Sequence, residues 1–195
     1  LRHPRSLSIS TYHFIQREDQ TAVHDLAKDM SLKDFLTHPE TIQKINNRMV
    51  RHLSFDLKED PEGQELFLSE QSIKVVNQWI EKGVNLNNQQ RLARAKKRLD
   101  DCSWLAVQEK LQESMQLFAY RFNLPPILEL PYLNAYKPNK KISNDCLELI
   151  DQQNHYDLQL YQYGLQKFNQ QYQEMLSKLE SLRSSCNQSI DDLID

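Results

Sequence analysis

Only three glycines occur among the 195 residues, and this scarcity is the feature that most constrains the fold. Seven prolines accompany them, while Leu, Gln, Lys and Glu, which favour helices, are abundant. The sequence therefore predicts a largely helical chain. With 39% hydrophobic and 26% charged residues, the composition is that of a soluble globular protein. A chain of this length buries one good core, so we expect one domain.

Helix starts are well marked along the chain. Pro4, then Ser31 with Asp34 three residues later, then Thr37 ahead of Pro39 are typical N-terminal signals. Together with the spacing of apolar residues, such signals predict helices near 4–18, 31–37, 39–53, 70–82, 88–101, 109–122, 143–151 and from 154 onward.

The helix predicted over 88–101 is basic and amphipathic. Its apolar residues Leu92, Ala95 and Leu99 share one face. Its cations are Arg91, Arg94, Lys96, Lys97 and Arg98. A cationic face of this kind usually only faces solvent. The alternative is that its charge attracts an anionic molecule that the protein acts on.

One short segment, 103–107, has the pattern of a buried β-strand. It is apolar and is followed at once by the helix predicted over 109–122, which indicates an α/β unit built on a parallel sheet. The stretch from Pro125 to Pro138 is irregular, and a loop this long inside a compact domain is more often functional than idle. Lys137, Lys140 and Lys141 lie in or just after it.

The last predicted helix carries a long apolar repeat. Asn154 and Asp157 are expected to cap its start. Steps of three and four separate Leu158, Tyr161, Leu165, Phe168, Tyr172, Met175, Leu179 and Leu182. Beyond Tyr172 two interpretations stay open: a coiled-coil seam that pairs with another copy, or an amphipathic helix that packs on its own domain and frays at the end.

Several classes of function are disfavoured. A net charge of −3 argues against broad capture of nucleic acid, so anion binding has to be local. The six histidines form no i, i+4 pair of the kind a helical metal site uses, so we expect no metal. Three widely spaced cysteines, Cys102, Cys146 and Cys186, are expected to be free thiols in a reducing compartment, which favours the cytoplasm. No apolar run approaches the ~20 residues of a membrane span.

The start of the chain carries the most specific motif. Leu1-Arg2-His3-Pro4 is followed by Ser10 and Tyr12. This pattern resembles the 3′-phosphate-binding motif of sulfotransferases that use phosphoadenosine phosphosulfate (PAPS) to modify heparan and related glycans. In that motif a second Arg follows where this chain has Leu7, and here Arg5 is displaced two residues upstream.

Four further blocks resemble the same family, in the family's order. They are Ser31 to Leu36, Asn47 to Leu53 with Met49 where Gln is usual, Ala95 to Met115 with Ala106 where Gly is usual, and Asn154 to Tyr161 followed by Phe168. The resemblance therefore spans residues 1–168.

The resemblance implies an α/β, P-loop-like sulfotransferase fold with a central parallel sheet whose first strands lie upstream of this chain. Residues 1–170 would be the C-terminal part of that domain, and 171–195 a helical extension. It implies PAPS as sulfuryl donor, a carbohydrate hydroxyl as acceptor, and nucleotide contacts from Arg2, Ser10, Lys137, Lys140 and Lys141. The 5′-phosphosulfate loop and the catalytic base are not found in this sequence, so we assign no catalytic residue and expect the chain alone to be inactive.

Because the chain begins with Leu and the motif at Leu1 lies well inside the fold in that family, we expect further sequence upstream, and a membrane anchor there stays open. Two other functions stay open. One is a degenerate family member that binds or assembles, as a homo-oligomer, through its C-terminal helix. The other, more distant, is a nucleotide kinase-like protein, which would need Mg²⁺ ligands that the sequence does not offer.

Overall fold

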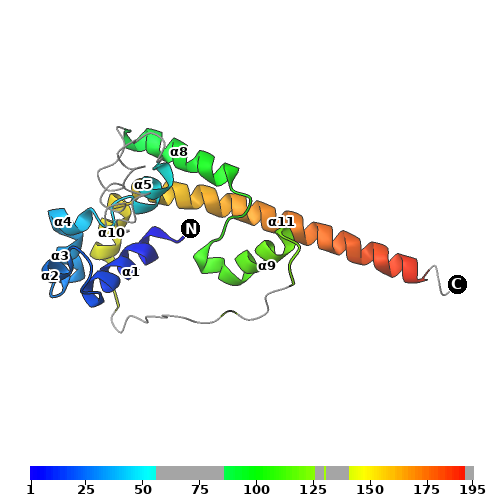
Figure 1. Ribbon diagram of the computed structural model, residues 1–195, viewed down its shortest axis with the longest axis horizontal. Coiled ribbons are helices and arrows are strands. Elements are labelled where there is room, and N and C mark those ends of the chain that lie inside the picture. Colours follow the sequence, from blue (N-terminus) through cyan, green and yellow to red (C-terminus); the bar gives the residue numbers. More distant parts are fainter. Residues whose placement is uncertain (56–85, 126–129, 131–140, 192–195) are drawn as a thin grey trace, which may run out of the picture. The chain divides into compact units, whose positions relative to one another are not determined.

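The computed structural model describes residues 1–55, 86–125, 130 and 141–191, with side chains up to residue 185. Its helices are α1 (Pro4–Arg17), α2 (His24–Ala27), α3 (Leu32–Thr37), α4 (Pro39–Ile42), α5 (Arg48–Ser54), α8 (Asn88–Asp101), η2 (Gln108–Lys110), α9 (Leu111–Arg121), α10 (Asn144–Gln153) and α11 (His155–Asp191) (Figure 1). The helix predicted over 70–82, and Lys137 and Lys140, lie outside the described residues.

The chain divides into two compact units. The larger unit comprises 2–102 and 136–162, and the smaller comprises Leu1, 103–135 and 163–195. Helix α11 begins in the larger unit and continues in the smaller one.

The larger unit has a hydrophobic core to which α1, α3 and α10 contribute. Helix α1 buries Pro4, Ser8, Thr11, Tyr12 and Ile15, which recur at helical spacing and so form one face. That face packs against α10, and α10 packs in turn against α3. The fully buried members of the core include Ala27, Phe35, Leu36 and Ile150.

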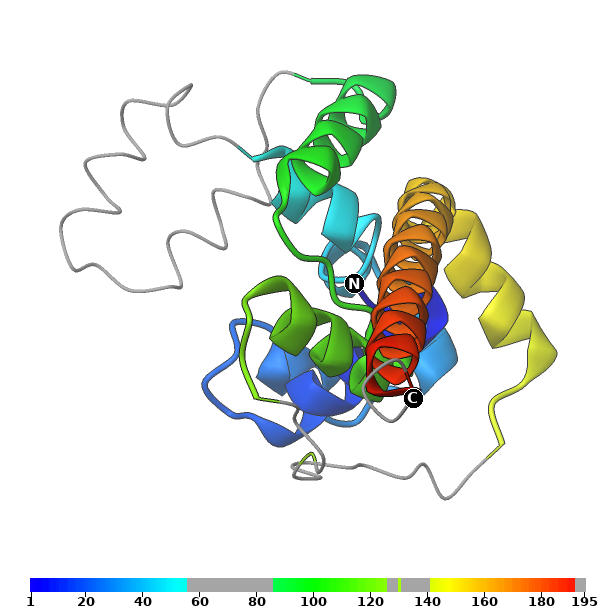
Figure 2. The same ribbon diagram turned by 90° about the vertical axis from the view of Figure 1, so that its right-hand side faces the viewer.

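The predicted helix signals are largely confirmed. Ser31 accepts a hydrogen bond from the backbone N–H of Asp34 at the start of α3. Ser143 caps α10 in the same way. At the start of α8, Asn87 and Gln90 form a capping box, which was not among the predicted helix signals. Helix α8 buries its predicted apolar face and packs beside α5, as Figures 1 and 2 both show.

The helix predicted as continuous over 39–53 is broken. Helix α4 ends at Ile42, and α5 begins only at Arg48. Between them Asn47 adopts the left-handed conformation, with φ 44° and ψ 42°, which an α-helix cannot contain. Asn is one of the few residues that tolerate this conformation, so Asn47 permits the break. The short helix α2 was not predicted.

The α/β fold with a central parallel sheet is wrong for the part of the chain that the structure describes, which contains helices and no strand. The segment 103–107 is extended, and Leu105 and Val107 are buried as expected. The Leu1 backbone lies against this segment: the Leu1 amino group donates to Ala106 O (2.5 Å), and Gln108 N–H donates to Leu1 O (2.8 Å). Hydrogen bonds to a single residue do not make a sheet, because a sheet needs a ladder of paired strand residues.

The smaller unit packs α9 on α11. Lys110 Nζ donates to Asn169 Oδ1 (3.0 Å), and Tyr172 Oη donates to Gln116 Oε1 (2.6 Å). Phe168 is fully buried and Met175 is 4% exposed, so the apolar seam of α11 is covered this far. Farther along the same seam, Leu179 is 44% exposed and Leu182 62%. Among the described residues, no helix combines the length and apolar character needed to cross a bilayer.

Candidate functional site

The start of α1 carries the residues that the sequence singled out. His3 is the N-cap: its Nδ1 accepts a hydrogen bond from Arg5 N–H (3.2 Å), and its carbonyl accepts one from Leu7 N–H (2.9 Å). Pro4 occupies the first helical position, where its missing N–H costs nothing. The His3 ring lies edge-on to Tyr161, with 5.1 Å between ring centroids. The sequence prediction of a proline-started helix at residue 4 is confirmed.

Arg2 and Ser10 are both half-buried, and they lie at different heights along the axis of α1. Arg2 precedes the N-cap, and Ser10 lies in the second turn. Six residues of α-helix between Pro4 and Ser10 correspond to about 9 Å of rise. An anion shared by the two therefore requires the Arg2 side chain to fold back along α1. Their convergence on one phosphate stays a prediction.

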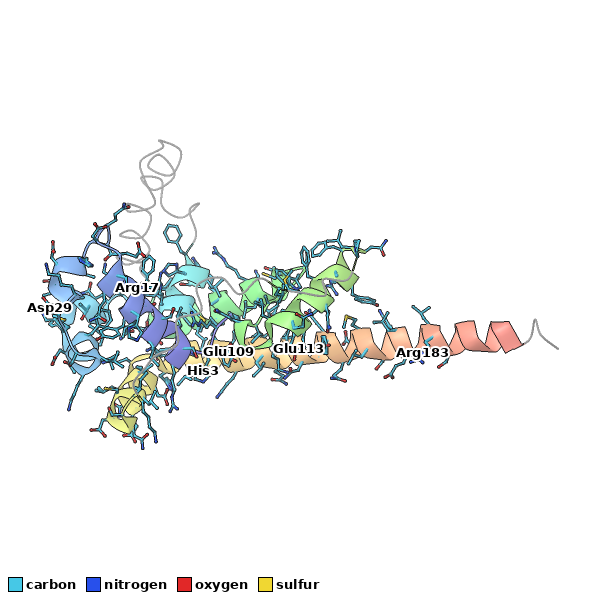
Figure 3. All side chains as sticks on the ribbon, turned by 90° about the horizontal axis from the view of Figure 1, so that it is seen from below. His3, Arg17, Asp29, Glu109, Glu113 and Arg183 are labelled. Atoms are coloured by element: carbon cyan, nitrogen blue, oxygen red, sulfur yellow. The ribbon has the colours of Figure 1, made fainter. Side chains whose placement is uncertain are left out.

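Ser10 belongs to a polar stripe that sequence reasoning missed. Ser6, Ser10, His13 and Arg17 follow at steps of four, three and four, so they lie on one side of α1, away from its buried face. Partial burial, and then the nearby Arg17 guanidinium, lower the pKa of His13. Figure 3 shows His3 and Arg17, the last residue of the stripe, near the two ends of α1. The helical spacing of the stripe was the signal available in the sequence.

Two other motif residues are engaged elsewhere. Arg5 forms a bidentate ion pair with Asp151 of α10, Nε to Oδ1 at 2.8 Å and Nη2 to Oδ2 at 2.5 Å. This pair, chiefly through its hydrogen bonds, raises the pKa of Arg5. Tyr12 is buried, and its hydroxyl donates to Met30 O (2.8 Å). Arg5 and Tyr12 therefore hold α1 in place, and neither offers its polar group to a nucleotide in this arrangement.

The remaining predicted groups are placed as follows. Lys141 is exposed, two residues before the N-cap of α10. Cys102 and Cys146 are free thiols, as predicted, and the Cys186 side chain lies outside the description. Within the described residues no cluster of three or more His, Cys, Asp or Glu side chains could hold a metal ion.

The start of α5 and the start of α11 cap each other through buried side chains. Asn47 Oδ1 accepts from the backbone N–H groups of Tyr156 (2.9 Å) and Asp157 (3.1 Å) at the start of α11. In return, the Asp157 carboxylate accepts from Met49 N–H (2.9 Å) and Val50 N–H (2.8 Å) at the start of α5. Asn154 Oδ1 closes the network by accepting from Asn47 N–H (3.0 Å).

This reciprocal network corrects the predicted cap of the last helix. The local capping rule predicts that Asn154 and Asp157 accept from the N–H groups of their own helix. In the structure they satisfy donors near the start of α5, and Asn47 satisfies those of α11. The local rule failed because the two helix starts meet, so each side chain finds a better-placed donor across the contact. Two of the blocks that resemble the sulfotransferase family thus contact each other directly.

Asp157 is the fully buried carboxyl group of this network. Burial raises its pKa to about 6, although the Val50 and Met49 N–H groups and the nearby Arg51 and Arg48 guanidinium groups all favour the charged form. Desolvation outweighs them. Asp157 therefore changes charge near neutral pH, unlike an ordinary aspartate.

Comparison with known proteins does not identify the chain: no family model matches its sequence, and no curated protein does either.

Proposed function

We propose that this chain belongs to a PAPS-dependent sulfotransferase that transfers a sulfuryl group to a hydroxyl of a carbohydrate acceptor. In this proposal Arg2 and Ser10 hold the 3′-phosphate of the nucleotide at the start of α1. The observation that carries the proposal is the placement of the Leu1 to Tyr12 motif: an arginine directly ahead of a capped, proline-started helix, with a half-buried serine farther along it.

The chemistry suits these residue types. A guanidinium binds a phosphate through two parallel hydrogen bonds, which an ammonium group cannot do. The first turn of α1 adds its positive dipole end, and Ser10 offers a hydroxyl donor. Of the three predicted lysines the structure describes Lys141, which follows the predicted loop, and in this proposal its exposed ammonium group adds a positive charge for the nucleotide or an acidic glycan.

The transfer itself is a displacement at sulfur. The acceptor hydroxyl gives its proton to a base that is not among the residues assigned here, and its oxygen forms a bond to sulfur. The bond between sulfur and the 5′-phosphate oxygen breaks, and adenosine 3′,5′-bisphosphate leaves. Positioning supplies much of the rate of such transfers. The residues assigned here hold the nucleotide, and none of them makes or breaks a bond. We therefore expect this chain by itself to bind adenosine 3′,5′-bisphosphate without turning over PAPS.

Titration calorimetry with adenosine 3′,5′-bisphosphate tests the assignment. Arg2→Ala should weaken binding by roughly 2–4 kcal/mol, because a charge-assisted, partly buried contact is lost. Arg2→Lys should recover only part of it. Lys33→Ala, which removes an exposed cation of α3, is the matched control and should leave binding unchanged.

Adenosine 5′-monophosphate, which lacks the 3′-phosphate, separates that contact from the rest of the nucleotide. It should bind the wild-type chain weakly, and Arg2→Ala should not weaken it further. Equal binding of the two nucleotides, or equal affinity of Arg2→Ala and wild type, would contradict the proposal.

A second function, assembly through the C-terminal helix, is favoured by one observation. The seam of α11 that is buried at Phe168 and Met175 continues in register to Leu179 and Leu182, which are exposed. In this proposal a second copy of the chain covers them, in a homo-oligomer.

A further inference from the structure

We propose that the Asn47, Asn154 and Asp157 side chains form a proton-linked latch, which joins the start of α5 to the start of α11 and closes more tightly as the pH falls. All three residues are buried, at 7%, 1% and 0% exposure. When the latch opens, α5 leaves α11, and Arg48 is drawn away from α1.

The latch has two discrete states because its hydrogen bonds depend on one another. Asn47 supplies an acceptor to α11 and receives one from Asn154, while Asp157 supplies an acceptor to α5. If one of these pairs separates, the others lose their geometry, and buried N–H groups are left without partners at a cost of about 1–3 kcal/mol each. Partial opening is therefore unfavourable, and the contact opens as a unit.

The latch is connected to the helix that carries the proposed nucleotide site. Arg48, the first residue of α5, donates from Nη1 to Thr11 Oγ1 of α1 (3.1 Å). Asn154 Nδ2 lies 3.5 Å from Ser8 Oγ on the same helix. Thr11 and Ser8 flank Ser10 in sequence. Opening the latch therefore withdraws the Arg48 contact from Thr11, the residue next to the serine assigned to the 3′-phosphate, while the Asn154 contact stays on the α11 side.

Proton linkage gives the direction of the effect. In the closed latch the pKa of Asp157 is raised to about 6, against 3.8 for a solvated aspartate. The charged groups that act on it are Arg51 and Arg48 of α5, and both favour its ionised form. The closed form binds the proton more tightly than the open form does, so closure is strongest below about pH 4 and weakens as the pH rises through about 6.

Amide hydrogen exchange measured by NMR tests the latch directly. When the pH is lowered from 7.5 to 5, the protection factors of the Met49 and Val50 amides, corrected for intrinsic exchange, should rise about tenfold. Over this range Asp157 takes up a proton in the closed form, where its pKa is about 6, but hardly at all in the open form, so the proton stabilises closure by about that factor. The Asp157 carboxyl carbon should titrate with a midpoint near 6. Unchanged protection, or a midpoint near 4, would overturn the proposal, and neither readout needs a variant.

Two variants sharpen the result. Asp157→Asn should abolish the pH dependence of protection at Met49 and Val50. Asp151→Asn is the matched control: it removes a different aspartate that also binds α1, through Arg5, and should leave the tenfold rise intact. Loss of the pH dependence in Asp151→Asn would assign the effect to the wrong carboxyl group and overturn the latch.

The coupling to the nucleotide rests on the proposed function and has its own readout. At pH 7.5, adenosine 3′,5′-bisphosphate at 100 times its dissociation constant should raise protection of the same amides about a hundredfold, if only the closed form binds it. Bound nucleotide without added protection would overturn the coupling but not the latch. Failure of the nucleotide to bind would overturn the proposed function, while the pH dependence in the free chain still decides the latch.

Discussion

At the scale of single residues, Tyr12 shows how a motif residue can serve the fold. Its ring packs edge-on to Phe35, with 5.2 Å between centroids, and its hydroxyl donates to the carbonyl of Met30. Gln16 Nε2 donates to the same carbonyl (3.0 Å). Tyr12 thus anchors α1 to the segment ahead of α3, and it sets the position of the helix on which Ser10 lies.

Tyr12→Phe should therefore lower stability slightly and leave ligand binding alone. The ring is kept, one hydrogen bond is lost, and Met30 O keeps Gln16 as a donor, so we expect a loss of about 0.5–1.5 kcal/mol in the free energy of unfolding. Urea denaturation measures it. The affinity for adenosine 3′,5′-bisphosphate should stay within about twofold of wild type, well under the 1.4 kcal/mol that a tenfold change represents. A tenfold loss would place the Tyr12 hydroxyl in the site.

At the scale of elements, the sequence predicted what neighbouring residues decide. The starts of α1, α3 and α10 follow from caps and prolines within a few residues, and the buried face of α8 follows from its apolar spacing. The break at Asn47 and the reciprocal caps depend on a contact between residues more than a hundred positions apart. No local pattern encodes that contact, so the single helix predicted over 39–53 does not match the two shorter helices of the structure.

Asn47 is the residue on which this contact depends most. Asn47→Ala should cost about 3–5 kcal/mol in unfolding free energy, because alanine disfavours positive φ by about 1–2 kcal/mol and two N–H groups of α11, a buried one at Asp157 and a part-buried one at Tyr156, lose their acceptor. Asn47→Gly should cost less, since glycine accepts the left-handed conformation but cannot cap. Denaturation of both variants separates the two terms. Gln43→Ala, which removes an exposed side chain of the turn ahead of α5, should cost under about 1 kcal/mol, and an equal loss there would contradict the assignment.

At the scale of the whole chain, composition indicated helices correctly, whereas the α/β expectation came from the sulfotransferase resemblance together with the interpretation of a buried apolar segment as a strand of a sheet. Residues 103–107 are indeed buried at Leu105 and Val107, but burial here comes from packing in a helical unit. Trp104 shows this, since its Nε1 donates to Ser114 O of α9 (3.0 Å) and its ring packs edge-on to Phe118. A short apolar run is compatible with either environment, because it carries no periodicity to distinguish them.

The end of α11 supports a prediction about assembly. Residues 177–185 are all exposed, and α11 extends beyond α9, with Arg183 on this part of the helix (Figure 3). An exposed helical segment as short as 177–185 is only marginally stable in water by itself, so pairing with a second copy through Leu179 and Leu182 would stabilise it.

Sedimentation velocity of the wild-type chain should show concentration-dependent association, and Leu179→Asp should abolish it by placing a charge in the seam. Glu180→Asp, which keeps the charge of an exposed neighbouring position, should associate as wild type does. Because the seam and the start of α1 are separate sites, adenosine 3′,5′-bisphosphate should bind Leu179→Asp normally, and a monomeric wild type at every concentration would contradict the pairing.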